Sequence, residues 1–563
     1  MARAATILKM PFPQRYSHDI DGYYLTMHPA SMTSDEKKGL FFLVVLSLAL
    51  RTVLILLKDG VGTDEVLYLL VGKNVWEGKG FTLLGYPMTM IHPLLPIVTG
   101  FFSLFTDNLE SGSTFVYVVF GTLTLVPFYL LVRSISGYQI AKIATSLLAV
   151  YSPLLLSFYW GSMTEPLYTF WMVLSLFTFH QAMESRMPSR FAISGMCFAL
   201  LYLSRSEGFI FFLVFSLYLM CAHGIRKELY KKSFLVNLLS FVLCFLLISM
   251  PYPLFIKKHT GTLTLSGKIK LILLAGAMDI TTREGYVGRL TTDGESFVNY
   301  EDLVKDKTVA DMILENPKVL VGGSFLQIKN FFVTLVSWKV YPLFLMPFLI
   351  LGIFHDPWDR ERLKNELFLF LSCTPFLVFL SFLIWPRYLL PMTPILLIWT
   401  ARGIYGLQKW MQQSAENIFT STRAANSSIR AIPMVLVILP LVIILVAKPI
   451  KAKLLVQYPV EYKIAGSWMN ENLPEDALIL ARKPEIAYYA KRLMHPLPNE
   501  DLPRVVHYAR RNHIGYMVLD EFTISSRPQL RYLLEEDIPS EELNVLYSEK
   551  SRNGRIIKVF QIN

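Results

Sequence analysis

The stretch that decides the fold is GLFFLVVLSLALRTVLILLKDGVGTDEVLY, residues 39–68. Residues 39–57 form an apolar run that is long enough to cross the hydrocarbon core of a bilayer as a helix. A short segment with two glycines then leads to the acidic pair Asp64 and Glu65. The stretch therefore predicts a membrane-spanning helix with two carboxylates just beyond its end.

The rest of the chain repeats this apolar character. It has 563 residues, of which 53% are hydrophobic and 13% aromatic, and its mean hydropathy of +0.42 is too high for a soluble protein of ordinary surface. We expect a polytopic α-helical membrane protein with about eleven transmembrane helices. The predicted spans are 39–57, 113–132, 140–157, 166–183, 191–204, 209–223, 234–256, 338–354, 367–384, 389–406 and 431–448.

Basic residues in the short loops predict the orientation, because Lys and Arg favour the cytoplasmic side. With the N-terminus inside, every basic loop lies on that side: Lys37 and Lys38, Arg133 and Lys142, Arg186 and Arg190, Arg226 to Lys232, Arg360 to Lys364, and Arg402 to Arg430. The formal charge of +11 then reflects topology and attraction to anionic headgroups. The sequence shows no basic stretch interleaved with aromatic residues, so it gives no indication of nucleic-acid binding.

Three regions follow from this topology. Residues 1–38 form a polar cytoplasmic segment that leads into an uncleaved anchor, and residues 39–448 form the membrane domain with long outer loops at 58–112 and 257–337. Residues 449–563 are polar and alternate helix-like with strand-like stretches, which predicts a small extracytoplasmic α/β domain. Its predicted elements are helices at 462–472 and 502–512, strands at 477–481 and 515–519, and a hairpin formed by 544–547 and 555–561.

Several motifs are missing from the sequence. Walker, Rossmann and HExxH patterns do not occur. All four cysteines fall inside predicted spans, which argues against a disulfide framework or a zinc site: Cys197, Cys221, Cys244 and Cys373. We therefore expect no cofactor and no nucleotide, with a divalent cation as the alternative that the sequence leaves open.

Polar residues collect instead at the outer ends of the predicted spans. In chain order they are Asp64 and Glu65, Glu165 in Thr164-Glu165-Pro166, Arg205 and Glu207 in Arg205-Ser206-Glu207-Gly208, Lys268 after Gly267, and Arg387 with Tyr388. This ordered set, together with the α/β tail, resembles the GT-C glycosyltransferases, in particular the branch of protein O-mannosyltransferases and aminoarabinose transferases. The resemblance covers nearly the whole chain.

The resemblance implies a reaction and a division of roles. A sugar would pass from a polyprenyl-phosphate donor to a hydroxyl of a protein, lipid or glycan acceptor at the outer membrane face, with inversion at the anomeric carbon. Asp64 matches the catalytic acidic position and would act as general base, while Glu65 would orient the acceptor or the base. Cations would absorb the charge of the leaving phosphate. The residues implied in substrate or phosphate binding are His92, Glu165, Arg205, Glu207, Lys268, Arg387 and Tyr388.

Most of these residues also have a purely structural interpretation. Glu165 complements a helix N-terminus, and Arg205 and Glu207 can pair with each other. Arg387 can anchor the chain at the interface, and a lone His92 before proline is often simply packed. Arg51 lies within the first span, where a charge is costly unless paired; it either serves the site from beneath or extends to the interface.

Two other classes of function stay open at this point. A multi-span transporter or lipid flippase would show deep ionisable residues in several spans and two matching halves, whereas here deep charges are few and no repeat is visible. A lipid-glycan polymerase or ligase would rest on basic residues in its outer loops without an acidic pair directly after the first span.

Overall fold

The computed structural model describes residues 32–563 with gaps. The residues outside the description are 57, 59, 107, 158–163, 226, 228, 269–288, 292, 298–310, 312–313, 315–323, 356, 382–383, 419–422, 455–459, 536–540 and 552–553. The predicted cytoplasmic segment 1–38 and the predicted outer loop 257–337 therefore lie largely outside the described residues.

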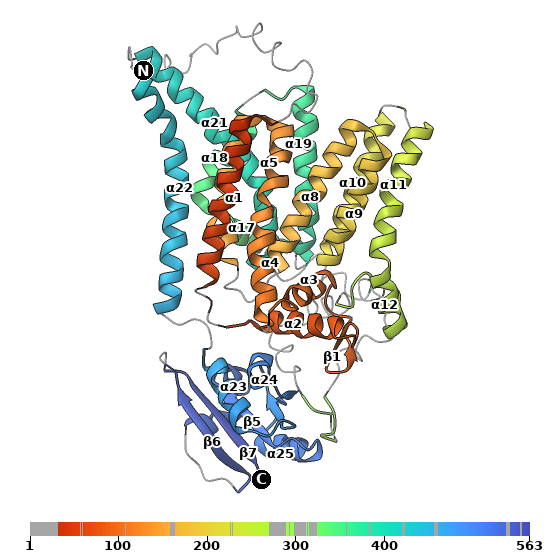
Figure 1. Ribbon diagram of the computed structural model, residues 1–563, viewed down its shortest axis with the longest axis vertical. Coiled ribbons are helices and arrows are strands. Elements are labelled where there is room, and N and C mark those ends of the chain that lie inside the picture. The colour runs from red at the N-terminus through yellow and green to blue at the C-terminus, as the bar shows by residue number, and fades with distance from the viewer. Residues whose placement is uncertain are drawn as a thin grey trace.

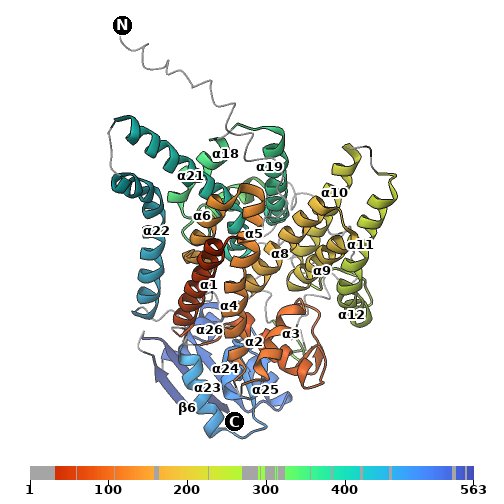
Figure 2. The same ribbon diagram turned by 45° about the horizontal axis from the view of Figure 1, so that its top comes forward.

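A bundle of long apolar helices forms the larger part of the molecule (Figures 1 and 2). Helices occur at each of the eleven predicted spans. Within the described residues, six segments are long and apolar enough to cross a membrane: Ser34–Ile55, Glu110–Ser136, Glu207–Ile225, Lys232–Ser249, Arg360–Leu380 and Ala431–Lys448. The multi-span helical fold predicted from the sequence is therefore confirmed. The bundle helices are α1 (Ser34–Ile55), α4 (Glu110–Leu123), α5 (Leu125–Ser136), α6 (Tyr138–Ala149), α7 (Ser152–Leu155), α8 (Thr164–Ser185), α9 (Pro188–Ser204), α10 (Glu207–Ile225), α11 (Lys232–Ser249), α17 (Ser324–Leu335), α18 (Met346–Phe354), α19 (Arg360–Cys373), α21 (Thr393–Ile418) and α22 (Arg423–Leu454).

The structure differs from the sequence-based boundaries at several places, including the following three. The predicted span 234–256 ends at Ser249, and a separate helix α12 (Pro251–Thr260) follows, because a proline lacks the amide hydrogen that continues a helix. The predicted span 338–354 begins only at Leu343, as the 3₁₀ turn Leu343–Leu345 followed by α18. Helix α17 lies in a region predicted as loop, since Gln327, Lys329 and Asn330 interrupt its apolar pattern.

The segment between α1 and α4 folds at one end of the bundle. It contains α2 (Thr63–Trp76), a hairpin of β1 (Thr82–Leu83) and β2 (Tyr86–Pro87), and α3 (Leu94–Ser103), which is too short to cross a bilayer. Helices α2 and α3 cross at Gly72 and Gly100, where a Cβ on either glycine would collide with the backbone of the other helix. Figure 1 shows α2 and α3 between the bundle and the C-terminal domain, so this is called the domain end.

The C-terminal domain is built on a five-stranded mixed sheet with the order β4-β3-β5-β7-β6. Strands β3 and β5 and strands β3 and β4 are parallel, and β7 runs antiparallel to β5 and β6. The domain comprises α23 (Val460–Asn472), β3 (Leu478–Ala481), α24 (Pro484–Ala490), β4 (Leu493–Pro496), α25 (Leu502–Arg511), β5 (Tyr516–Asp520), α26 (Glu521–Ser526), α27 (Tyr532–Glu535), β6 (Leu543–Lys550) and β7 (Ile556–Ile562).

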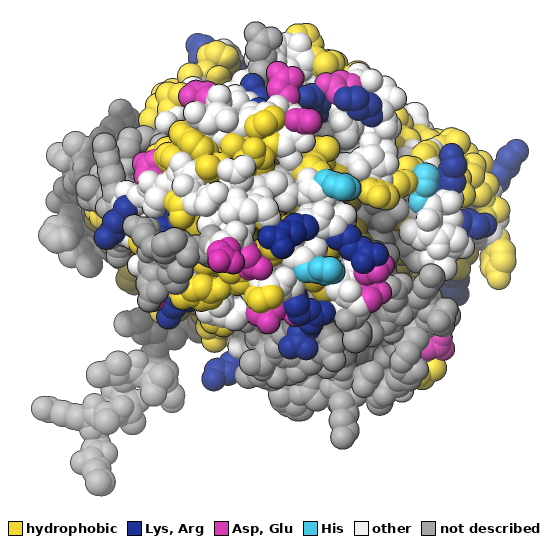
Figure 3. Space-filling model, turned by 90° about the horizontal axis from the view of Figure 1, so that it is seen from below, with side chains coloured by type: hydrophobic (Ala, Val, Ile, Leu, Met, Phe, Trp, Pro, Cys, Tyr) yellow, Lys and Arg dark blue, Asp and Glu magenta, His cyan; other side chains and the backbone are white. Residues whose placement is uncertain are grey.

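The predicted α/β character of this domain is confirmed, with α24 and β4 as elements that the sequence-based prediction lacked. Figure 3 views the molecule from this end and shows side chains of both charges interspersed over the surface, as is typical of a face in water.

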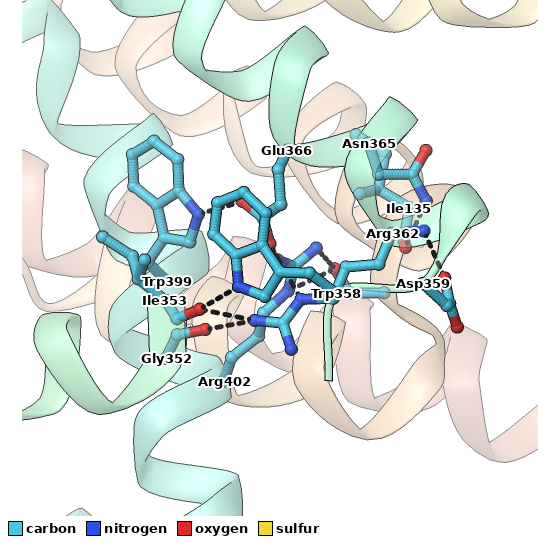
Figure 4. Close-up of polar contacts among 11 residues, drawn as sticks. Ile135, Gly352, Ile353, Trp358, Asp359, Arg362, Asn365, Glu366, Trp399 and Arg402 are labelled. Carbon is cyan, nitrogen blue, oxygen red and sulfur yellow. Dashed lines mark hydrogen bonds and ion pairs between the residues drawn. The ribbon is translucent and has the colours of Figure 1, made fainter. Parts of the chain in front are cut away.

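A buried ion cluster fastens the opposite end of the bundle (Figure 4). The fully buried Glu366 of α19 accepts hydrogen bonds from Trp399 Nε1 at 2.6 Å and Arg362 Nε at 3.3 Å, and it pairs with Arg402 of α21. Arg402 Nε also donates to Ser136 Oγ at 3.0 Å, and Arg362 Nη2 donates to the Ile353 carbonyl at 2.8 Å. The cluster therefore joins α5, α18, α19 and α21, and its buried carboxylate is compensated.

Candidate active site

The acidic pair occupies the first turn of α2. Gly62 is the N-cap, so Asp64 and Glu65 are the second and third helical residues, where the helix dipole favours negative charge. The Glu65 carboxylate accepts a hydrogen bond from the Gly62 amide at 3.1 Å, which satisfies one of the unpaired donors at the helix start. The local sequence thus explains both why the helix begins here and why it carries two carboxylates.

Glu65 points into the protein. Its residue is fully buried, and Lys58 Nζ lies 2.5 and 2.6 Å from its two carboxylate oxygens. Ser113 of α4 donates a further hydrogen bond to Oε1. These contacts tie the start of α2 to the segment after α1 and to α4. Glu65 therefore faces away from the partners of Asp64.

Asp64 points toward the second half of the chain. Its side chain is 39% exposed, and its Oδ2 lies 2.8 Å from Nη1 of Arg387. Arg387 belongs to the one-turn helix α20 (Pro386–Leu389), which leads through a 3₁₀ turn into α21. The ion pair spans more than 300 positions of sequence and leaves both groups in contact with solvent.

A second set of charges surrounds Arg205, which lies between α9 and α10. Its guanidinium is 2.8 Å from Glu207 and 3.7 Å from Glu165, the residue in the first turn of α8. It also lies 5.1 Å from the ring centre of Tyr388, and the Arg387 guanidinium lies 5.3 Å from the same ring. Tyr388 therefore contacts both cations and joins the Arg205 cluster to the Asp64–Arg387 pair.

His92 lies beside this cluster in the segment before α3. Its ring contacts the rings of Tyr202 and Tyr252, with centres 5.4 and 4.9 Å away. Both ring nitrogens are buried, and neither has a hydrogen-bond partner among the described residues. The pKa of His92 is lowered to about 4, chiefly by burial, with the charge of Glu207 raising it and that of Lys268 lowering it. The imidazole is therefore neutral at pH 7.

Lys268 is exposed at the edge of the same cluster, in the segment that follows α12. Its surroundings lower its pKa, chiefly through loss of hydration and then through the charges of Arg387 and Arg205, while Asp64 raises it. Tyr202 supports this segment by donating a hydrogen bond to the Leu265 carbonyl at 2.7 Å. Lys268 thus shares with Arg387 an interaction with the charge of Asp64.

The structure brings most of the predicted site residues together at the domain end. Asp64, His92, Glu165, Arg205, Glu207, Lys268, Arg387 and Tyr388 form one connected region of contacts and electrostatic interactions. Glu65 is the exception, because it faces the interior beside α4. Within the described part of the chain, no group of three or more His, Cys, Asp or Glu residues could hold a metal ion.

Tyr68 is a further residue of this region, and the sequence reasoning missed it. It follows Asp64 by four positions in α2, so the two side chains lie on one face of the helix. Burial raises the pKa of its phenol, and the charges of Asp64 and Glu165 raise it further. The i, i+4 spacing was the signal available in the sequence.

Comparison with known proteins gives one family and a set of related folds. Residues 92–252 match the model of the family described as dolichyl-phosphate-mannose-protein mannosyltransferase. The archaeal oligosaccharyltransferase AglB from Archaeoglobus fulgidus, solved with an inhibitory peptide and a dolichol-phosphate, has a TM-score of 0.54 at 14% identity, covering 93% of this chain and 74% of AglB. ArnT from Cupriavidus metallidurans bound to undecaprenyl phosphate also has a TM-score of 0.54 at 14% identity, covering 92% of this chain and 97% of ArnT. No curated protein matches the chain.

These findings agree with the features described at the domain end. The structural likeness establishes the fold, and the family match covers the segment from His92 to Tyr252 that includes Glu165, Arg205 and Glu207. Together they confirm the resemblance to GT-C glycosyltransferases that the ordered polar residues indicated.

Proposed function

We propose that this multi-pass membrane glycosyltransferase with a GT-C fold transfers a sugar from a polyprenyl-phosphate donor to a hydroxyl of a protein, lipid or glycan acceptor. Transfer takes place at the extracytoplasmic face, and Asp64 is the general base. The observation that carries the proposal is the Asp64–Arg387 pair, which sets a solvent-accessible carboxylate 2.8 Å from a guanidinium at the domain end. A base for the acceptor and a cation for the leaving phosphate thus lie side by side.

In an inverting displacement the acceptor oxygen and the leaving phosphate lie on opposite sides of the anomeric carbon, so Arg387, which is paired with Asp64 through Nη1, would reach the phosphate through its remaining N–H groups. The acceptor oxygen forms a bond to that carbon while the bond from carbon to the phosphate oxygen breaks, and the configuration inverts. The hydroxyl proton passes to the carboxylate of Asp64, and the electron pair leaves with the polyprenyl phosphate. Arg387 holds Oδ2, so we assign Oδ1 as the atom that accepts the proton.

The cations of the cluster have different surroundings and therefore different roles. Arg205 is compensated by Glu165 and Glu207, so it serves mainly to hold α8, α9 and α10 around the site. Lys268 and Arg387 are closer to solvent and have the charge needed to bind a phosphate. Tyr388 supports both arginines through its ring.

His92 contributes a neutral donor and acceptor. Its buried nitrogens have no partner among the described side chains and backbone, and a hydroxyl of the sugar would satisfy them. We therefore assign His92 to recognition of the donor sugar, in agreement with its lowered pKa.

The proposal is tested with purified protein in lipid nanodiscs. A panel of polyprenyl-phosphate sugars is supplied with acceptor alcohols, and release of polyprenyl phosphate is followed. The wild-type protein should release it, and Arg387→Ala should raise the donor KM. Asp476→Asn, which changes an exposed aspartate of the C-terminal domain, serves as a matched control for substitutions at Asp64. Absence of release with every donor, or an unchanged donor KM in Arg387→Ala, would overturn the proposal or the role of Arg387, respectively.

A further inference from the structure

The turn that carries Asp64 is held by the C-terminal domain. The Val61 amide donates a hydrogen bond to the Tyr489 hydroxyl at 2.9 Å, and the Thr63 hydroxyl donates to Glu485 Oε1 at 2.6 Å. Lys483 Nζ also donates to Thr63 Oγ1, at 3.4 Å. The partners all come from α24 or the residue before it, more than 400 positions away in sequence.

This contact is largely buried. The apolar side chains of Val61, Val66 and Leu69 form a small core against which Tyr488 and Tyr489 pack. Glu485 is 4% exposed, so its hydrogen bond from Thr63 is shielded from competing water. A shielded hydrogen bond fixes geometry more firmly than an exposed one. The contact is therefore suited to fixing the position of the turn.

Consecutive residues of the turn are anchored to different parts of the molecule. Val61 and Thr63 are bound by α24, Asp64 by Arg387 of α20, and Glu65 by Lys58 and Ser113. Thr63 and Glu65, the two neighbours of Asp64 in the first turn of α2, are thus each held by a different part of the molecule. A shift of α24 would therefore move the carboxylate of Asp64 relative to Arg387.

We infer that α24 positions the general base, with Glu485 and Tyr489 as positioning residues that act through Thr63 and Val61. The inference rests on the proposed function of Asp64 and deepens it. A displacement of about 1 Å at a reacting group can lower the rate about 10²-fold. The C-terminal domain is thus part of the apparatus that orients the base, in addition to any contact it makes with the acceptor.

Substitutions that remove a single hydroxyl group test this inference with little change in shape. Thr63→Val removes the hydroxyl and Thr63→Ser retains it, so we expect Thr63→Val to lower kcat about 10-fold or more and Thr63→Ser to stay near the wild-type value. Tyr489→Phe should also lower kcat. Tyr488→Phe is the matched control, because Tyr488 lies in the same interface and no hydrogen bond from its hydroxyl to residues 61–63 is among the described contacts.

Two readouts separate positioning from simple stabilisation. The donor KM and the unfolding temperature should stay near wild type in Thr63→Val, while amide hydrogen exchange at residues 61–65 should speed up in Tyr489→Phe and not in Tyr488→Phe. If wild-type kcat persists in both Thr63→Val and Tyr489→Phe while Asp64→Asn is inactive, the inference fails and the proposed function stands. If Asp64→Asn transfers sugar normally, the proposed function fails, and the exchange data alone decide whether α24 holds the turn.

Discussion

Substitution of Lys58 by methionine separates the roles of the two adjacent carboxylates. In the wild-type protein Lys58 Nζ lies 2.5 and 2.6 Å from the oxygens of Glu65, and the two side chains are 6% and 1% exposed. Lys58→Met leaves the charge of Glu65 buried with two neutral donors among the described residues, the Gly62 amide and the Ser113 hydroxyl. Removal of one partner from a buried ion pair typically costs about 3–5 kcal/mol in the free energy of unfolding.

A double-mutant cycle measures directly how strongly Lys58 and Glu65 stabilise the fold as a pair. Glu65→Gln should destabilise the protein by a comparable amount, because it leaves the ammonium group of Lys58 without its partner. The combined variant removes both charges and should recover most of the unfolding free energy that each single variant loses. The coupling free energy between the two substitutions should therefore be several times the ~0.5 kcal/mol by which substitutions at independent sites depart from additivity. The unfolding free energies are measured by denaturant titration in mixed micelles, with tryptophan fluorescence as the signal.

The same variants distinguish a structural role of Glu65 from a catalytic one. Because Glu65 anchors the turn of Asp64, Lys58→Met and Glu65→Gln should lower transfer per folded molecule to a similar extent, and the combined variant should regain part of it. The reasoning is refuted if Glu65→Gln unfolds at the wild-type denaturant concentration but loses as much activity as Asp64→Asn. In that case Glu65 would take part in the reaction itself.

Three further predictions concern other parts of the fold. Folding lowers the pKa of His92 from 6.5 to about 4, so as the pH falls His92 is protonated in the unfolded chain before it is protonated in the folded protein. The free energy of unfolding should therefore decrease between about pH 6.5 and pH 4. His92→Phe should flatten this part of the pH profile of the unfolding midpoint. Gly403→Leu should lower the unfolding temperature strongly, because its Cβ would collide with the Phe348 carbonyl oxygen where α18 crosses α21, whereas Gly39→Leu, with open space around Gly39, should have little effect. Arg402→Met leaves the buried Glu366 with weaker compensation and should cost about 3–5 kcal/mol of unfolding free energy, while Lys409→Met on the same helix should not.

The apolar runs were sufficient to predict the membrane bundle, because a spanning helix needs a length and a hydropathy that few other elements share. Boundaries at prolines, such as the break before Pro251, were less certain from composition alone. Helix α24 was not predicted, since seven residues with mixed polarity give no clear period. The side-chain directions of Asp64 and Glu65 also could not be predicted. Neighbouring residues of a helix point about 100° apart, and only the distant partners Arg387 and Ser113 show that the Asp64 side chain, and not that of Glu65, faces the site.

The central claim is that Asp64 accepts the proton of the acceptor hydroxyl. Its most direct test is the single-turnover rate of Asp64→Asn with a saturating polyprenyl-phosphate sugar, together with the affinity of the same variant for the donor. Asparagine keeps the shape and a hydrogen-bond acceptor for Arg387 but is a far weaker base. We predict that the rate falls about 10²–10⁴-fold while donor affinity stays close to that of Asp476→Asn. A folded Asp64→Asn variant that transfers sugar at the wild-type rate would contradict the account.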